Sequence, residues 1–382
     1  MRGGTMSNNW ARPRQNSIEA IAHAMTVADG AEYDIRMSID GELILHHNAR
    51  IERSEKDEHY EGLHPYVEQN HSDDLRNAGF DLFSDMIEDP RVHSAWIEGD
   101  AFSCIEIKRP HPKSKLAGGY LPSEKRVDWV VRMMQRVSEI MENEPAPERT
   151  AVFYCFDPAT MRASQKADVN IPAAPINPFI PPWGPGPLRR TMALPSFARS
   201  TVPRMIERWK RAGAPLLPLA SDHIRSWSKY LHLGRSVSLT PSSVKRLNRQ
   251  RKGYPIHVWP APIDLERRII DAGMTVVSDE MDPTILQTSR GETRWMKPGT
   301  KPLSPELWAR MADPSEDSEI LLAEAKDCPT WSGLDISERR EHLGHLARRL
   351  QCDTIAIDEG APPWEMPRFI GHRGAGKSHK EG

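Results

Sequence analysis

The sequence of 382 residues lacks long hydrophobic runs, paired cysteines and an apolar leader. No stretch approaches the roughly 18 consecutive apolar residues of a membrane-spanning helix. The first residues hold no apolar core of a secretory signal, which predicts a cytoplasmic protein. The four cysteines are widely spaced and form no C-x-x-C pair, which argues against a disulfide framework or a thiolate metal site. The length allows one large domain with additions, or two ordinary ones.

Charge is distributed unevenly along the chain, although the net charge is only -2. Residues 188–252 contain 15 Lys or Arg and two acidic residues, whereas residues 312–366 contain 13 acidic and five basic residues. The basic block would attract a phosphate-bearing substrate or an anionic membrane, but such blocks are more often solvated helical faces. The acidic block predicts a helical appendage, with a helix over 336–350 that begins at Asp335 or Ser337.

Short apolar or β-branched runs alternate with helical patterns, which indicates a parallel sheet of βα units. Eight candidate strands span residues 31–37, 42–47, 104–108, 150–155, 174–177, 236–239, 256–259 and 275–278. Eight is the number that a (β/α)8 TIM barrel requires. The run Phe369-Ile370 is a ninth candidate, one more than the barrel needs. Residues 174–177 are the weakest candidate, because they lie between prolines.

Carboxylates alternate with other side chains on two of these strands. Glu32 and Asp34 share one face of the first, and Glu106 shares the inward face of the third with Lys108. Neighbouring carboxylates repel one another, and a hard divalent cation usually relieves that repulsion. A solvent-facing acidic edge, or a simple ion pair between Glu106 and Lys108, is the alternative.

Two histidines end the second candidate strand, after the turn at Asp40-Gly41. The carboxyl ends of barrel strands are where chemistry is placed, and histidine is suited to proton transfer near neutral pH. His47 is therefore a candidate acid or base, and a structural, hydrogen-bonded histidine is the alternative.

These segments together resemble the glycerophosphodiester phosphodiesterase family. The matching residues are Asn16-Ser17, Glu32-Tyr33-Asp34, Asp40-Gly41, His47-Asn48 and Ile105-Glu106-Ile107-Lys108, with sparser matches at 156–158, 254–259 and 271–279. The family's first strand carries a His-Arg-Gly motif, which occurs here only near the opposite end, as His372-Arg373-Gly374. The resemblance therefore implies a circularly permuted barrel whose first strand comes from the C-terminus. Chance recurrence of the motif in a tail is the alternative.

The implied organisation has three parts. Residues 1–286 would form the barrel with strands 2–8, residues 287–366 an acidic, mainly helical insertion, and residues 367–382 strand 1. The oligomeric state is left open.

The resemblance also implies a chemistry, which is cleavage of glycerophosphodiesters to glycerol 3-phosphate and an alcohol. Mg²⁺ or Ca²⁺ would lie on Glu32, Asp34 and Glu106, and His372 and His47 would be the general acid and base. Arg373 and Lys108 would bind the phosphate. Trp259 would pack on the substrate, unless it is a core residue of the barrel rim. The expected partner is a small phosphodiester and not a nucleic acid, with peripheral contact to an anionic membrane left open.

Two departures from the family pattern concern charge. Gln15 and Asn48 stand where the family has acidic residues, and each position loses a negative charge next to the expected metal ligands. These departures motivate one rival hypothesis, a non-catalytic binding relic of the family. A lipid phosphodiesterase similar to lysophospholipase D or sphingomyelinase D is the other rival, and the basic block motivates it.

Overall fold

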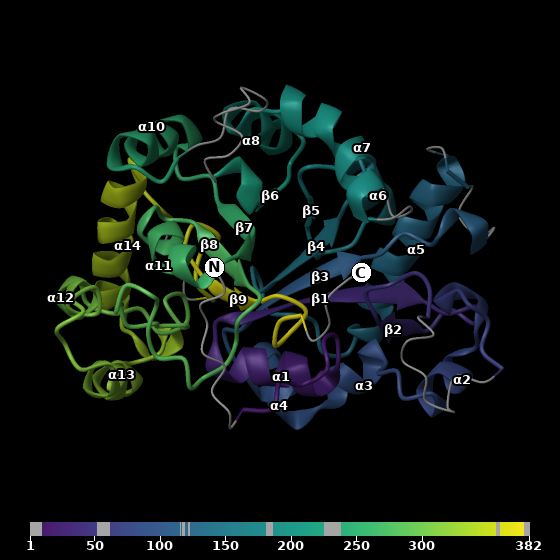
Figure 1. The fold of residues 1–382 in the computed structure, drawn as a ribbon, viewed down its shortest axis with the longest axis horizontal. Coiled ribbons are helices and arrows are strands. Elements are labelled where there is room, and N and C mark those ends of the chain that lie inside the picture. Colours follow the sequence, from purple (N-terminus) through teal and green to yellow (C-terminus); the bar gives the residue numbers. More distant parts are fainter. Residues whose placement is uncertain are drawn as a thin grey trace.

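Eight parallel strands surround the centre of the molecule (Figure 1). The structure is a computed structural model that describes residues 10–51, 62–114, 116, 119–120, 123–180, 186–224, 238–356 and 360–377. The strands follow one another in space in the order β5-β4-β3-β1-β9-β8-β7-β6. They are β1 (Gly30–Met37), β3 (Phe102–Ile107), β4 (Ala151–Cys155), β5 (Ala173–Pro175), β6 (Leu217–Ala220), β7 (Ile256–Ala261), β8 (Thr275–Ser278) and β9 (Phe369–Gly371).

The two ends of this strand order meet at Asn177, just after β5. Its N–H donates to the Pro218 carbonyl at 3.0 Å, and its carbonyl accepts from the Ala220 N–H at 2.9 Å. These bonds join β5 to β6 in parallel. The sheet is thereby closed, and the predicted (β/α)8 TIM barrel is confirmed.

Strand β9, near the C-terminus, lies between β1 and β8. Ile370 pairs with Gly30 on one side and with Val277 on the other. The buried Asp29 carboxylate accepts hydrogen bonds from the backbone N–H groups of Phe369 at 2.8 Å and Thr300 at 2.7 Å. The ninth candidate strand is therefore a barrel strand, and the chain closes its barrel with residues from both ends.

Two strand predictions were wrong, and one barrel strand was missed. Residues 42–47 contain only β2 (Leu43–Leu45), which pairs antiparallel with the end of β1 and is not a barrel strand. The sixth strand, β6, was missed in favour of residues 236–239, of which 236–237 lie outside the described residues and 238–239 are in no strand. Residues 173–175 do form a strand, although the neighbouring prolines made it the weakest candidate.

Prolines made the two short strands β5 and β6 hard to recognise from the sequence. Pro218 lies inside β6 and Pro175 ends β5. Proline cannot donate to a strand partner, so sequence patterns argue against a strand. Its carbonyl still accepts, and that of Pro218 receives the N–H that closes the barrel.

Helices cover the outside of the barrel (Figure 1). In α1, Ser17 caps the first turn by accepting from the Ala20 N–H, and Ile21, Ala24 and Met25 are buried. The α-helices are α1 (Ile18–Val27), α2 (Ser72–Asn77), α3 (Phe83–Glu88), α4 (Pro90–Val92), α5 (Glu124–Ile140), α6 (Thr160–Ala167), α7 (Gly186–Arg199), α8 (Val202–Arg211), α10 (Pro241–Arg251), α11 (Ile263–Asp271), α12 (Pro305–Arg310), α13 (Ser318–Asp327) and α14 (Ile336–Leu350).

The last three helices form the acidic appendage before β9. Helix α14 is capped by Asp335, one of the two candidates from the sequence, and Asp335 forms a capping box with Glu338. The Trp308 indole donates to Asp271 of α11 at 2.7 Å, which ties the appendage to the barrel. No helix in the described part of the chain is long and apolar enough to cross a membrane.

Candidate active site

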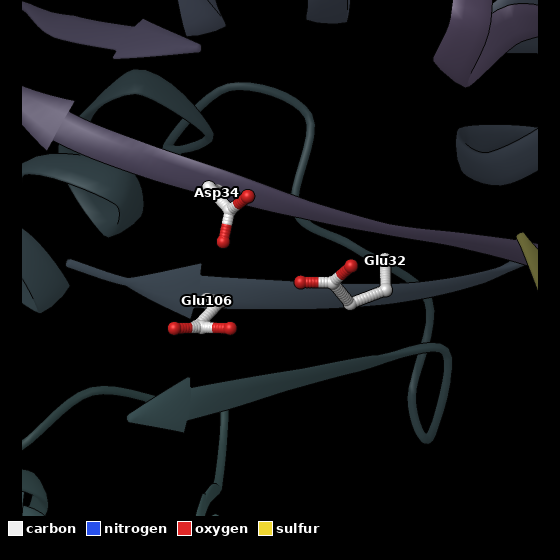
Figure 2. Close-up of side chains that lie close together, drawn as sticks. All are labelled: Glu32, Asp34 and Glu106. Carbon is white, nitrogen blue, oxygen red and sulfur yellow. The ribbon is translucent and has the colours of Figure 1, made fainter. Parts of the chain in front are cut away.

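Three carboxylates point toward one another from two adjacent barrel strands (Figure 2). Glu32 and Asp34 belong to β1 and Glu106 to β3, where Asp34 and Glu106 are paired in register. One oxygen of each lies within 4.8 Å of the others. The residues are only 3%, 1% and 5% exposed, which excludes the solvent-facing acidic edge.

Burial determines the electrostatics of this trio. It raises the pKa of Glu32 well above its usual range, together with repulsion from Asp34 and Glu106. Burial likewise raises the pKa of Glu106 to about 7, against the attraction of Lys108. The pKa of Asp34 is lowered in spite of its burial, because Lys108 and other positive groups stabilise its charged form.

One carboxylate oxygen of the trio suggests that a cation binds there. Glu32 Oε2 accepts the Arg373 backbone N–H at 2.8 Å, but the buried Glu32 Oε1 has no hydrogen-bond partner within the described part of the chain. A buried carboxylate oxygen without a donor is costly, and three clustered carboxylates are the donor set that hard divalent cations prefer. The residues present therefore fit a divalent cation.

Two cationic side chains border the carboxylates. Lys108 Nζ lies 2.8 Å from Asp34 Oδ1 and also contacts Glu106 Oε1. Arg373 Nε lies 3.8 Å from Asp34 Oδ2, and Arg373 Nη1 donates to Gln15 Oε1 at 3.0 Å. Lys108 thus bridges two carboxylates instead of pairing with Glu106 alone, and Gln15 orients Arg373.

His372 lies directly after β9, beside Glu32. Its Nε2 is 3.7 Å from Glu32 Oε2, and its Nδ1 is 2.5 Å from Asp279 Oδ1. Its backbone N–H donates to the Ser278 carbonyl at 2.8 Å. Burial lowers the pKa of His372, although Asp279 acts in the opposite direction. The far end of the chain thus brings its histidine to the carboxylates.

His47 follows β2 and approaches the same carboxylates. Its Nδ1 lies 2.7 Å from Asn48 Oδ1, so the amide fixes the orientation of the ring. Burial lowers the pKa of His47 well below its usual range, with further contributions from Lys108 and Arg373. The neighbouring His46 instead packs edge-on against Phe80.

The part of the chain that holds the trio and His47 matches a known family. Residues 2–177 match the sequence profile of the glycerophosphoryl diester phosphodiesterase family. The match covers 176 of the 382 residues, so this part of the chain is similar in sequence to the family. The enzyme class is therefore that of a glycerophosphodiester phosphodiesterase, and a small phosphodiester is the corresponding kind of substrate. His372 and Arg373 lie outside the matched residues.

Several solved structures are similar to this chain. A glycerophosphodiester phosphodiesterase from Thermotoga maritima is 17% identical with a TM-score of 0.43, over 71% of this chain and 90% of that one. A phosphodiesterase from Oleispira antarctica, in complex with the product sn-glycerol-3-phosphate, is 12% identical with a TM-score of 0.44, over 69% and 86% of the two chains. These TM-scores are too low to support the fold assignment, which we base on the strand pairing alone. No curated protein matches the chain.

Trp259 packs against Phe156, whose ring also lies near Lys108. It lies half-buried within β7, two residues before the end of the strand, and its ring meets the Phe156 ring edge-on with centroids 5.3 Å apart. Lys108 Nζ lies 5.8 Å from the centroid of the same Phe156 ring. The Phe156 and Trp259 rings thus form an aromatic pair next to Lys108, and Phe156 is what links Trp259 to Lys108.

Several supporting residues were not predicted from the sequence. Asn16 binds Asp34 twice, donating to its Oδ2 at 2.8 Å and accepting from its backbone N–H at 2.9 Å. Arg36 donates to the His47 carbonyl at 2.7 Å and forms a buried ion pair with Glu68 at 2.5 Å. Arg36 alternates with Glu32 and Asp34 on β1, which was the available signal for it. Glu68 offered no such signal.

Asp279 is the most consequential residue that was missed. It follows β8, at the carboxyl end where catalytic groups gather, and that position was the signal for it. We expect Asp279→Asn to lower kcat by about tenfold to a hundredfold, because the imidazole loses the carboxylate that orients it. In this variant, the part of the pH–rate profile that reports the titration of His372 should move to lower pH, since Asp279 raises the pKa of His372.

A pH–rate profile measures both effects. Asp282→Asn in the same loop is the matched control, because Asp282 accepts from Thr284 and does not contact His372 in the described contacts. An unchanged profile in Asp279→Asn, with a lower melting temperature only, would assign Asp279 a structural role.

Proposed function

We propose that the chain hydrolyses glycerophosphodiesters to glycerol 3-phosphate and an alcohol, with Mg²⁺ or Ca²⁺ held by Glu32, Asp34 and Glu106. The observation that supports this most strongly is the buried carboxylate trio with its unpaired Glu32 oxygen, next to two histidines. When bound, the cation would polarise the phosphorus through a non-bridging oxygen. Lys108 and Arg373 bind the remaining phosphate oxygens as fixed positive charges.

The two histidines divide the proton transfers in this proposal. Nδ1 is engaged in each, by Asp279 in His372 and by Asn48 in His47, so that Nε2 faces the substrate. One imidazole accepts the proton of the attacking hydroxyl, and the other donates a proton to the leaving oxygen. This division requires one neutral and one protonated ring at the start of the reaction.

The neutral residues at positions 15 and 48 are compatible with activity. Gln15 Oε1 still accepts from Arg373, and Asn48 Oδ1 still lies within hydrogen-bond distance of His47 Nδ1. The orienting contacts therefore persist without the two negative charges. This favours an enzyme over a binding relic. The lipid phosphodiesterase remains the second candidate function, favoured by the basic block at 188–252.

Removal of the metal tests the proposal. Chelator-treated protein should release glycerol 3-phosphate from glycerophosphocholine at least about a hundredfold more slowly, and Mg²⁺ or Ca²⁺ should restore the rate. Calorimetric titration with either ion should show about tenfold or greater weakening in Glu106→Gln. Glu42→Gln, outside the trio, is the matched control. Undiminished activity in chelator would refute the metal scheme, and turnover of micellar lysolipid alone would favour the second candidate.

We also infer that the chain is a circular permutant of its family, with residues 1–286 and 367–382 forming one barrel and residues 287–366 inserted before its first strand. The insertion of β9, followed by His372-Arg373-Gly374, between β1 and β8 supports this. The first and last described segments also lie close together, since Arg12 Nη1 donates to the Lys377 carbonyl at 3.3 Å. Joining these ends would restore the family's order of segments.

A further inference from the structure

The outer face of α7 carries large apolar side chains in contact with solvent. Leu188, Met192 and Leu194 are 45%, 42% and 41% exposed, whereas Ala193 packs inward. Thr191 and Pro195 are exposed as well, so the described side chains of this face carry no charge. A helix face of this kind is unfavourable in water and marks a site of interaction.

The next two helices present a basic surface beside α7. Helix α8 follows α7 after two residues, and α10 packs against α8 (Figure 1). Glu207 is the one acidic residue of α8 and α10, and it pairs with Arg211 at 2.7 Å. The exposed basic side chains are Arg204, Arg208, Lys210, Arg211, Lys245, Arg246 and Arg249, with Lys252 just after α10.

The underside of α8 shows that this basic face is anchored. Val202, Met205, Ile206 and Trp209 are buried against the barrel. The positive charges of α8 are therefore held on the outside of a helix that is fixed to the barrel.

We propose that the exposed faces of α7, α8 and α10, together called the α7–α10 surface, dock on an anionic lipid bilayer. The lysines and arginines would bind the phosphate-bearing headgroups, while Leu188 and Met192 enter the boundary of the acyl chains. A nucleic acid would satisfy the charges but leave the apolar face in water. The inference concerns where the protein acts and is independent of the hydrolysis proposed above.

Another part of the molecule provides an internal contrast. Ile320 and Ile336 are 62% and 45% exposed, but they lie on α13 and at the start of α14. This segment belongs to the block with 13 acidic and five basic residues, which an anionic bilayer would repel. Exposed aliphatic side chains alone therefore do not define the docking surface. Their combination with positive charge does.

Co-sedimentation of the full chain with lipid vesicles tests the proposal. The protein should sediment with mixed phosphatidylglycerol and phosphatidylcholine vesicles and remain in solution with phosphatidylcholine alone. Lys245→Glu/Arg249→Glu should lower the partition coefficient by about tenfold or more, and added salt should act in the same direction. Leu188→Ser/Met192→Ser should lower it by about tenfold as well, because two apolar side chains lose their burial.

Ile320→Ser/Ile336→Ser is the matched control and should bind vesicles as the unaltered chain does. Thermal unfolding of each variant verifies the fold, so that weak binding is not a result of misfolding. The proposal is overturned if the unaltered chain fails to sediment with the anionic vesicles. It is also overturned if the control pair loses binding equally, or if Leu188→Ser/Met192→Ser binds at full strength. The last result would leave only a charged surface that binds any polyanion, such as heparin.

Discussion

Replacement of His47 by alanine is expected to lower kcat for glycerophosphocholine by about 10²–10⁴-fold, which is the usual contribution of a general acid or base. His47 lies at the carboxylate trio with its backbone carbonyl held by Arg36 and its ring by Asn48. His372→Ala should cause a loss of similar size. KM should change little, because neither imidazole is expected to provide ground-state binding. Steady-state kinetics with a coupled assay for glycerol 3-phosphate measures both constants.

A substrate with a better leaving group separates the roles of the two histidines. Protonation matters less when the departing alcohol is a nitrophenol, so the variant that lacks the general acid should recover most of its rate with such a diester. The variant that lacks the general base should not recover. His71→Ala, on the surface at the start of α2, is the control. If kcat of His47→Ala stays within about tenfold of the unaltered value, the histidine scheme is wrong.

The second large effect is expected from truncation after Met366, which removes β9. Phe369 and Ile370 are fully buried, and their loss alone would cost about 3–6 kcal/mol. The neighbouring strands β1 and β8 would also lose their backbone partners, and Asp29 would lose the Phe369 N–H. Since domains are stable by only about 5–15 kcal/mol, the truncated chain should not unfold cooperatively. Urea denaturation followed by near-UV circular dichroism measures this.

A shorter truncation after Lys377 is the control for that experiment, and we expect it to keep the fold, since every barrel contact of β9 lies before this residue. A rearranged chain that begins at residue 367, with Lys377 joined to Trp10 by a short linker, should regain both the cooperative transition and activity. Cooperative unfolding of the chain that lacks residues 367–382 would show that β9 is dispensable. Failure of the rearranged chain alone would contradict the circular permutation.

Much of the site was readable from strand periodicity. Glu32 and Asp34 share a face because side chains alternate along a strand, and the same rule placed Glu106 beside Lys108. Each of these two pairs was assigned correctly to one face of its own segment. The adjacency of β1 and β3, which turns two pairs into one cluster, is a property of the sheet. Family resemblance, and not periodicity, connected His372 to this cluster.

The supporting contacts were not readable in this way. Asp279 meets His372 across 93 positions of sequence, and Glu68 meets Arg36 across 32. No local pattern encodes which distant side chain will lie at hydrogen-bond distance. The same holds for β6, whose proline-containing segment becomes a strand only because Asn177 and β7 supply partners on its two sides.

The sequence by itself determined the local features of this protein. It specified which residues share a strand face, that α14 is capped at Asp335 or Ser337, and that three carboxylates and a His-Arg-Gly motif are present. These features depend on backbone geometry over a few residues. Only the tertiary structure decided that Asn177 joins β5 to β6 and so closes the barrel, that Lys108 bridges Asp34 and Glu106, and that Asp279 orients His372. Those outcomes depend on which distant strands become neighbours, which is set by closure of the whole sheet around one core.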